Sequence, residues 1–304
     1  MAALAAGGLV LAAVVALVVT GRQGQAGAAA PSGSLVRLDP RTARVTSRMP
    51  VAGHPGAVAV TPGGVWMADF ERGNLWRYQP GAEHLDAVSS TGEPRDIAAL
   101  NGKVYVASDE AWAQGAVARY DAASGLRETA IDLVACALAS GDGVLWAAGC
   151  PYVQRLSTGA GPVRKVREVF LPYRAPATVS NSRVQYREMA VGGGVLVVLG
   201  DALDSRVWKL DARTGKVLST TTLGFPPYSV AVSAGRAWIT DAVDDAVVPL
   251  DLRTGRLGAP VKAGRGASGI AAGAGSLWVA NTLDGTVSRI DPVRARVTAT
   301  VKVG

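Results

Sequence analysis

One glycine recurs along this 304-residue chain at spacings of 39, 41, 51, 41 and 40 residues. An alanine stands four residues before each copy, and a Trp or Tyr stands three residues after five of the six. Between successive copies lie four short apolar or alternating runs, closed by Gly, Asp or Asn, with no helical period. The chain is therefore predicted to be all-β and built from a repeated four-stranded unit. The six glycines are Gly63, Gly102, Gly143, Gly194, Gly235 and Gly275.

A four-stranded unit of this length is typical of a β-propeller blade, a small sheet that cannot bury both of its faces alone. The recurring glycine is expected in the hairpin between the first and second strands, where a tight turn favours a residue with positive φ. Apolar residues occupy both faces of each predicted sheet. We therefore expect neighbouring blades to cover one another, with the aromatic face of one against the alanine face of the next.

The third strand of each unit ends in a three-residue tag: a cation in all but one unit, then an apolar residue and, most often, an aspartate. This aspartate precedes turn residues, and its carboxylate is expected to accept hydrogen bonds from the next backbone N–H groups. There are seven such third–fourth strand pairs but only six first–second pairs. Six complete blades therefore run from about His54 to Gly304, and residues 33–53 form an extra outer hairpin. A seven-position ring with an incomplete first blade and a six-bladed ring with an added hairpin both fit. The seven tags begin at Arg37, Arg77, Arg119, Arg155, Lys209, Pro249 and Arg289.

The first 21 residues contain no charge and are almost entirely apolar. This length is enough to cross a bilayer as a helix, so residues 1–21 are predicted to be a transmembrane anchor, with a cleaved signal segment as the alternative. Residues 22–32 are expected to be a flexible linker and residues 33–304 the propeller domain. The protein is accordingly expected at the cell membrane with the propeller on the extracytoplasmic side, or secreted if the segment is cleaved.

The net charge of +7 invites a nucleic-acid interpretation. The arginines recur once or twice in each repeat instead of clustering, so we expect a solvated basic surface and no nucleic-acid partner. The two cysteines, Cys136 and Cys150, lie seven residues before and seven after Gly143. They should face each other or sit one step apart on one hairpin, and outside the cytoplasm such a pair is expected to form a disulfide.

The segment Ser276-Leu277-Trp278-Val279-Ala280-Asn281, followed by residues 285–292, resembles the bacterial YVTN-type repeat proteins and is close in pattern to the streptogramin B lyase-like propellers. The resemblance covers residues 33–304. It implies a seven-bladed ring and is our reason for favouring seven positions. The lyase-like members would imply a magnesium-assisted elimination by histidine and glutamate on the channel face, but those residues do not map onto this sequence. The matching residues are those that build hairpins, so function has to be argued from a site.

Residues suited to catalysis are few, since His54 and His84 are the only histidines. No Cys–His metal spacing, phosphate loop or Ser–His–Asp arrangement is evident, so no catalytic residue, metal site or cofactor is predicted. An enzyme is less expected than a non-catalytic binding domain, a sensor or scaffold whose partner is a small molecule, a peptide or an envelope protein. The lyase-like enzyme acting at the channel mouth remains the alternative.

The positions seven before and seven after the recurring glycine carry complementary couples in several blades. Two of them pair an arginine with an aspartate, as cross-strand neighbours do. Because the first strand is innermost in a propeller, these positions should lie at one mouth of the channel. They predict a polar rim that binds the ligand, or, as the alternative, ion pairs that only hold two strands together. The rim residues at these positions are Arg95, Asp109, Arg187, Asp201 and Tyr228, and the adjacent Asp96 and Glu188 are expected to point toward the same end.

Overall fold

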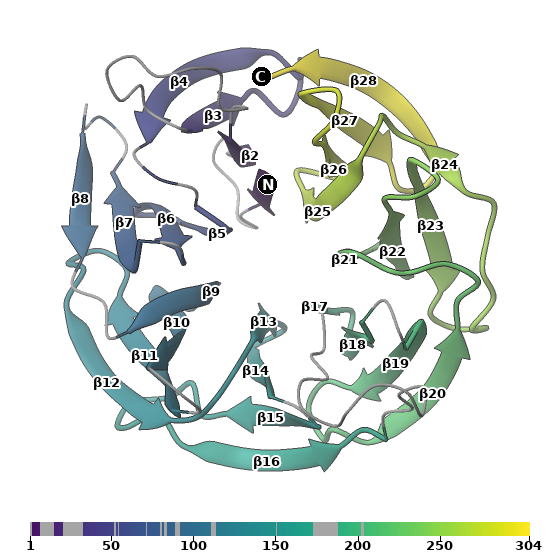
Figure 1. Cartoon of the computed structure of the whole chain (residues 1–304). Helices are drawn as coiled ribbons and strands as arrows, with labels where there is room; N and C mark the ends of the chain where they lie inside the picture. Colours follow the sequence, from purple (N-terminus) through teal and green to yellow (C-terminus); the bar gives the residue numbers. More distant parts are fainter. Residues whose placement is uncertain are drawn as a thin grey trace.

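The computed structural model describes residues 2–6, 15–20, 33–51, 53, 55–70, 72–79, 81, 84–88, 92–110, 114–149, 151–172, 188–201 and 204–304. These residues form antiparallel four-stranded sheets arranged in a ring (Figure 1), which confirms the all-β propeller. The first strand of each sheet is innermost and the fourth is outermost.

The six complete repeats predicted from the sequence are confirmed as blades 2 to 7. Blade 2 comprises β5 (Ala57–Thr61), β6 (Gly64–Asp69), β7 (Asn74–Tyr78) and β8 (Leu85–Val88). Blade 3 comprises β9 (Glu93–Leu100), β10 (Lys103–Glu110), β11 (Gln114–Asp121) and β12 (Arg127–Asp132). Blade 4 comprises β13 (Ala137–Gly141), β14 (Val144–Gly149), β15 (Tyr152–Leu156) and β16 (Lys165–Phe170).

Blades 5 to 7 continue the ring to the C-terminus. Blade 5 comprises β17 (Glu188–Gly192), β18 (Val195–Leu199), β19 (Arg206–Asp211) and β20 (Val217–Thr222). Blade 6 comprises β21 (Val230–Ser233), β22 (Arg236–Asp241), β23 (Ala246–Asp251) and β24 (Val261–Lys262). Blade 7 comprises β25 (Ala267–Gly273), β26 (Ser276–Asn281), β27 (Thr286–Asp291) and β28 (Arg296–Lys302).

A further four-stranded sheet, blade 1, lies between blades 7 and 2. Its outer half is the predicted extra hairpin, β3 (Gly33–Leu38) and β4 (Val45–Val51). Its inner half is β1 (Ala2–Ala6) and β2 (Val15–Thr20), with β2 paired to β3 and β1 beside β5 and β25. The ring therefore holds six complete repeats and a seventh sheet completed by the N-terminal residues.

The sequence predicted a membrane helix over residues 1–21, whereas the structure has strands at 2–6 and 15–20. Residues 7–14 and the predicted linker, 22–32, lie outside the described residues. Within the described part of the chain, no helix is long and apolar enough to cross a bilayer. Strands covered on both faces by neighbouring blades are as continuously apolar as a membrane helix, so hydropathy alone does not separate the two.

The recurring glycine occupies the expected hairpin turn. Five of the six copies have positive φ, for example Gly235 at 72°, and each of these follows a residue that also has positive φ. This is the two-residue turn that matches the twist of paired strands. Blade 2 differs, because there Gly64 and not Gly63 takes the positive φ, at 145°.

Two of these turns place an alanine in the left-handed region, Ala234 at φ 51° and Ala274 at φ 50°. Since the left-handed conformation costs an alanine roughly 1–2 kcal/mol, and asparagine tolerates it better, Ala234→Asn should raise the free energy of unfolding by about 0.5–1 kcal/mol. The Asn101-Gly102 turn of blade 3 already has this pattern. Urea unfolding measures the change. The same substitution at the exposed Ala123, which lacks positive φ, should give no gain, and equal effects at both sites would contradict the explanation.

The expectation that aromatic and alanine faces lie on opposite sides of a blade is wrong. In each hairpin the alanine pairs directly with the aromatic position, as Ala231 does with Trp238, so both side chains lie on one face. A two-residue turn pairs the residue four before the glycine with the residue three after it. Counting odd and even positions from the glycine assigned these two residues to opposite faces, although paired residues share a face. The fully buried Trp238 packs against aliphatic residues of the next blade, including Ile270 and Val279.

The turns between third and fourth strands are built as predicted. In five blades one aspartate oxygen accepts from the backbone N–H groups two and three residues later, as Asp251 does from Arg253 at 3.0 Å and Thr254 at 2.6 Å. These hydrogen bonds lower the pKa of the carboxyl group. The other four are Asp39, Asp121, Asp211 and Asp291.

In five blades the cation at the first position of the third-strand tag joins adjacent blades. Its side chain donates to a backbone carbonyl in the corresponding turn of the next blade; Arg119 Nη1, for example, donates to the carbonyl of Gly159 at 2.8 Å. Blade 6 has Pro249 at this position, and Arg236 of its second strand makes the bond instead, to Pro292. The regular spacing of arginine in the sequence is thus partly explained by contacts between blades. The remaining bonds are from Arg77 to Ala123, Arg155 to Arg213, Lys209 to Leu252 and Arg289 to Arg41.

Candidate functional site

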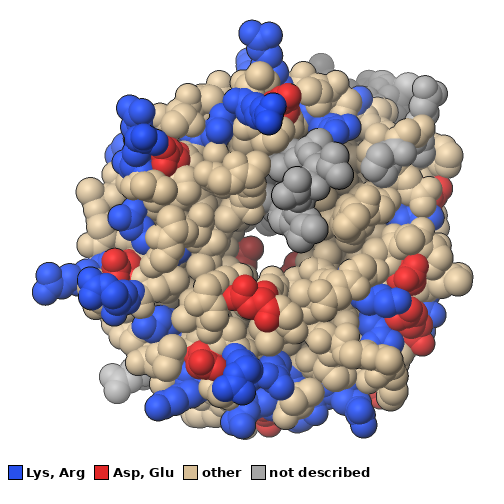
Figure 2. All heavy atoms as spheres, turned by 180° about the vertical axis from the view of Figure 1, so that it is seen from behind, with Lys and Arg blue, Asp and Glu red and all other residues tan. Residues whose placement is uncertain are grey.

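The predicted rim lies at one end of the ring, which we call the mouth. It is the end at which the innermost strands begin and the second strands finish, because successive strands of a blade alternate in direction. Arg95, Asp96 and Asp109 belong to blade 3, Glu188 and Asp201 to blade 5, and Tyr228 to the start of blade 6. Arg187 lies outside the described residues. A space-filling view along the ring, seen from behind the view of Figure 1, shows an opening at its centre (Figure 2).

A register shift in blade 3 sets the position of Arg95. Ala107 of β10 pairs with Asp96, but the next residue, Ser108, pairs with Pro94, so Arg95 has no residue directly opposite. Such a bulge redirects the side chain of the extra residue. Arg95 Nε donates to Asp109 Oδ2, which confirms the contact expected between these two residues.

The face of the Arg95 guanidinium covers an aromatic ring of the neighbouring blade. Its central carbon lies 4.2 Å from the ring centroid of Phe70, at the end of β6 in blade 2, a cation–π contact. The rim prediction did not include Phe70, although Phe70 occupies in blade 2 the same position seven residues after the glycine that Asp109 occupies in blade 3. Residues at equivalent positions of adjacent blades become neighbours. The repeat spacing could therefore have predicted that Phe70 lies beside Arg95 and Asp109.

Arg95 keeps hydrogen-bonding capacity for a ligand. Its Nη1 and Nη2 groups donate to none of the described residues, and a third of its side chain is exposed, 33%. A guanidinium held by one nitrogen and one aromatic face still offers a pair of N–H donors, the geometry that matches a carboxylate or phosphate.

Asp96 connects two blades and has little capacity left. Its Oδ1 accepts from the N–H of Ile97 at 2.8 Å, and its Oδ2 accepts from the N–H of Leu138 in blade 4 at 2.6 Å. Burial raises the pKa of Asp96 to about 6, against the opposing effect of these two hydrogen bonds. Ser229, at the equivalent position of blade 6, accepts from Ile270 of blade 7 at 3.3 Å. The side chain at this position therefore links the inner strands of adjacent blades in both cases.

The other rim residues lie where the sequence placed them, in or beside the strands that reach the mouth. Glu188 begins β17 opposite Leu199. Asp201 follows β18, and its Oδ1 accepts from the N–H of Asp204 at 2.9 Å in a turn. Tyr228 is half-buried, and its N–H donates to the carbonyl of Thr240 at 3.0 Å. The expected Arg187–Asp201 pair involves a residue outside the described part of the chain, so it stays a prediction.

Cys136 reaches the same level in blade 4. Its N–H donates to the carbonyl of Ala148 at 2.8 Å, and Ala137 pairs with Ala148. Continued by one residue, this register places Cys136 opposite Gly149. Cys150 lies outside the described residues, and the disulfide stays a prediction.

The described residues hold no group of three or more His, Cys, Asp or Glu side chains that could bind a metal ion. His84 is exposed, beside the outermost strand of blade 2, with Nε2 3.2 Å from Asp86 Oδ1. It therefore lies on the outside of the ring and away from the channel. His54 is outside the described residues.

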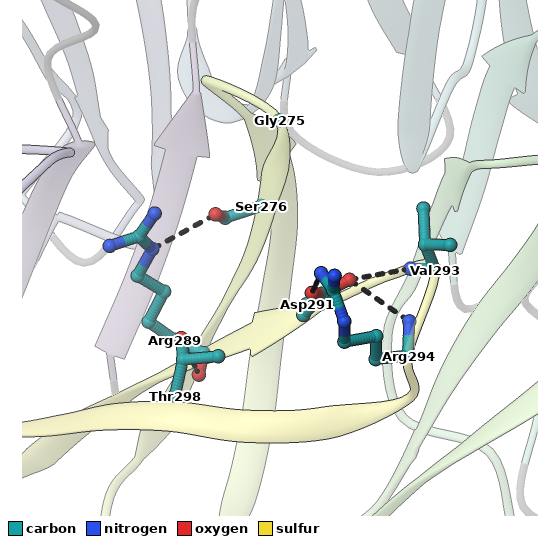
Figure 3. A pocket seen from close by; sticks show the side chains of 7 residues that line it. All are labelled: Gly275, Ser276, Arg289, Asp291, Val293, Arg294 and Thr298. Atoms are coloured by element: carbon teal, nitrogen blue, oxygen red, sulfur yellow. Dashed lines mark hydrogen bonds and ion pairs between the residues drawn. The ribbon is translucent and has the colours of Figure 1, made fainter.

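A separate pocket of about 480 Å³ lies at the opposite end, beside the outer hairpin of blade 7 (Figure 3). The side chains that line it bond mainly to one another. Arg289 Nε donates to Ser276 Oγ at 2.9 Å, and Arg294 Nη1 pairs with Asp291 at 2.9 Å. These contacts use much of the pocket's hydrogen-bonding capacity, so we do not take it as the ligand site.

No protein-family model matches the sequence, and no curated protein does. Solved structures do match. A structure of Kuenenia stuttgartiensis hydrazine synthase is similar with a TM-score of 0.69 and 18% identity, over 91% of this chain and 92% of that one. The computationally designed Ika8 protein gives 0.65 and 13%, over 99% and 86% of the two chains. Apo AztD from Citrobacter koseri gives 0.58 and 12%, over 95% and 83%.

By fold the chain is a β-propeller. Identities this low support the architecture and do not carry an activity across. The lyase-like family to which the sequence shows a resemblance is not identified by these comparisons, so that relationship stays a hypothesis.

Proposed function

We propose that the protein is a non-catalytic binding domain that takes an anionic group of its ligand at the mouth. The observation that carries this proposal is Arg95, whose two terminal amino groups have no partner among the described residues. A binding residue needs donors that the fold itself does not use, and Arg95 has them.

The contacts around Arg95 also favour recognition over a purely structural role. Asp109 holds one edge of the guanidinium and Phe70 covers one face, so the side chain is already oriented before a ligand arrives. Preorganisation lowers the entropy cost of binding. The acidic side chains of Asp109 and Glu93 nearby should disfavour highly charged polyanions, and so favour a ligand with a single carboxylate or phosphate group.

The proposed location is extracytoplasmic, in keeping with the apolar N-terminal residues and the expected disulfide. A segment that crosses a bilayer cannot at the same time pair with β3 as β2 does here. The N-terminal residues can therefore either anchor the protein in a membrane or complete blade 1, but not both. An alkaline phosphatase fusion to the C-terminus should be active if the propeller is exported. An inactive fusion, made at normal levels, would contradict this location.

Binding at the mouth can be tested with Arg95→Gln. Acetate, succinate, inorganic phosphate and a short peptide with a free C-terminal carboxylate serve as probes in NMR and calorimetric titrations. At least one probe should bind the wild-type protein, and loss of a charged hydrogen bond should weaken its binding at least tenfold. Arg95→Lys should restore binding only in part, because lysine lacks the paired donors.

The matched control is Arg265→Gln, which removes an exposed arginine from the same end of the ring. It should leave the dissociation constant unchanged. Equal affinity of wild type and Arg95→Gln for every probe that binds would show that the rim is structural and that the site lies elsewhere.

A further inference from the structure

The end of the ring opposite the mouth carries the turns between third and fourth strands. Four consecutive blades, 5, 6, 7 and 1, each place two cations in this turn. All eight side chains are exposed. They form what we call the basic arc, which consists of Arg41, Arg44, Arg213, Lys216, Arg253, Arg256, Arg294 and Arg296.

Most cations of the basic arc make no ion pair with a described residue and can interact with an external anion. Only Arg294 makes an ion pair with a described residue, Asp291. Each of the four turns also holds an aspartate whose carboxyl pKa is lowered, mainly by hydrogen bonds from the turn backbone and, at Asp211, mainly by the Thr214 hydroxyl. The carboxylate oxygens of these aspartates accept hydrogen bonds within the turn. Because each turn has two exposed cations and one aspartate, its net charge is positive.

The mouth end of blades 5, 6 and 7 carries acidic residues as well as the cations Arg206, Lys262, Arg265 and Lys302. Acidic residues follow the second strands there, in the turns that lead to the third strands. Each turn of the basic arc, in contrast, has two cations for one aspartate. On the face of the molecule that Figure 2 shows, Lys and Arg side chains are distributed around the outer part of the ring. The acidic residues at the mouth end are Asp201, Asp204, Asp241, Asp244, Asp245 and Asp284.

Each turn of the basic arc also carries an exposed apolar side chain next to a cation. Val45 follows Arg44, Val217 follows Lys216, Leu257 follows Arg256 and Val293 precedes Arg294. Their exposures run from 37% for Val45 to 73% for Val293. Single exposed apolar residues are common, but here one recurs beside the cations of all four turns.

We propose that the basic arc is a docking surface for an anionic lipid bilayer. The turns lie at one end of the ring, so the eight cations are spread along its outer edge over four neighbouring blades. Cations attract the headgroups of anionic lipids, and adjacent apolar side chains enter the interface between headgroups and acyl chains. Blades 2 and 3 lack the paired cations, and blade 4 has Arg164 and Lys165, of which Lys165 pairs with Glu168 at 2.8 Å. The ring would therefore tilt onto blades 5, 6, 7 and 1.

The test uses the full chain with vesicles of phosphatidylcholine containing 30% phosphatidylglycerol, and with vesicles of phosphatidylcholine alone. The difference between the two isolates the electrostatic part from any partitioning of the apolar N-terminal residues. Co-sedimentation should show stronger binding to the anionic vesicles, falling as salt is raised. The variant Arg213→Gln/Lys216→Gln/Arg253→Gln/Arg256→Gln should reduce that binding at least 100-fold, since each basic residue contributes about fivefold.

The matched control removes four exposed cations from the mouth end, as Arg72→Gln/Lys262→Gln/Arg265→Gln/Lys302→Gln. It has the same net charge as the basic-arc variant and should bind anionic vesicles nearly as well as wild type. A second variant, Leu257→Ser/Val293→Ser, should weaken binding without changing charge. Equal losses in the two fourfold variants would overturn the proposal. So would binding of a 20-base-pair DNA duplex as tight as that of the anionic vesicles, because the surface would then take any polyanion.

Discussion

Replacing Trp146 with alanine should lower the free energy of unfolding by about 3–5 kcal/mol, the range for a large aromatic side chain removed from a core. Trp146 is fully buried at the interface between blades 4 and 5, where it packs with Met189, Leu196 and Val198. Its indole Nε1 also donates to the carbonyl of Ala212 in blade 5 at 2.8 Å. The substitution would remove both the apolar contact and the hydrogen bond between the two blades.

Chemical denaturation followed by circular dichroism measures this change. Phe170→Ala is the control, because Phe170 lies in the outermost strand of the same blade and is 57% exposed. It should cost less than about 1 kcal/mol, most of it from an edge-on contact with Tyr152. Similar losses for the two variants would mean that stacking between blades does not dominate stability.

Reducing a disulfide between Cys136 and Cys150 should lower the free energy of unfolding by about 3 kcal/mol. The bond would close a loop of roughly 15 residues around the first hairpin of blade 4, and the chain-entropy estimate for that length gives this value. Cys136→Ser/Cys150→Ser should show the same loss without reductant and no further change with it.

Mass analysis after alkylation decides whether the bond exists. Exported protein alkylated without reductant should carry no label on either cysteine. Two labelled thiols would contradict the disulfide, and the matching stability difference between oxidised and reduced protein would then be absent.

Local patterns in this sequence predicted local structure well. The spacing of Gly102, Gly143 and the later copies located the hairpin turns, and the aspartate tags located the outer turns with their hydrogen bonds. Both features depend on a few neighbouring residues and on φ preferences that a sequence displays directly. The contact between Arg95 and Asp109 could also be predicted, because both residues belong to one hairpin.

Features that depend on pairing across a turn or between blades were harder to predict. The same-face pairing of Ala231 with Trp238 depends on the number of residues in the turn, which an odd–even count does not capture. The contact of Arg95 with Phe70 and the bond from Arg119 to Gly159 cross between blades, so predicting them requires a comparison of equivalent positions in adjacent repeats. The membrane segment predicted over residues 1–21 stays a prediction, because buried strands and membrane spans share the same hydropathy.

The most direct test of the proposed function is a crystal structure of the propeller with the tightest-binding carboxylate or phosphate probe. The account predicts the anion at the mouth, with two of its oxygens about 2.7–3.0 Å from Arg95 Nη1 and Nη2 and with Phe70 still covering the guanidinium. An anion bound elsewhere on the ring, with Arg95 unoccupied in the same crystal, would contradict it.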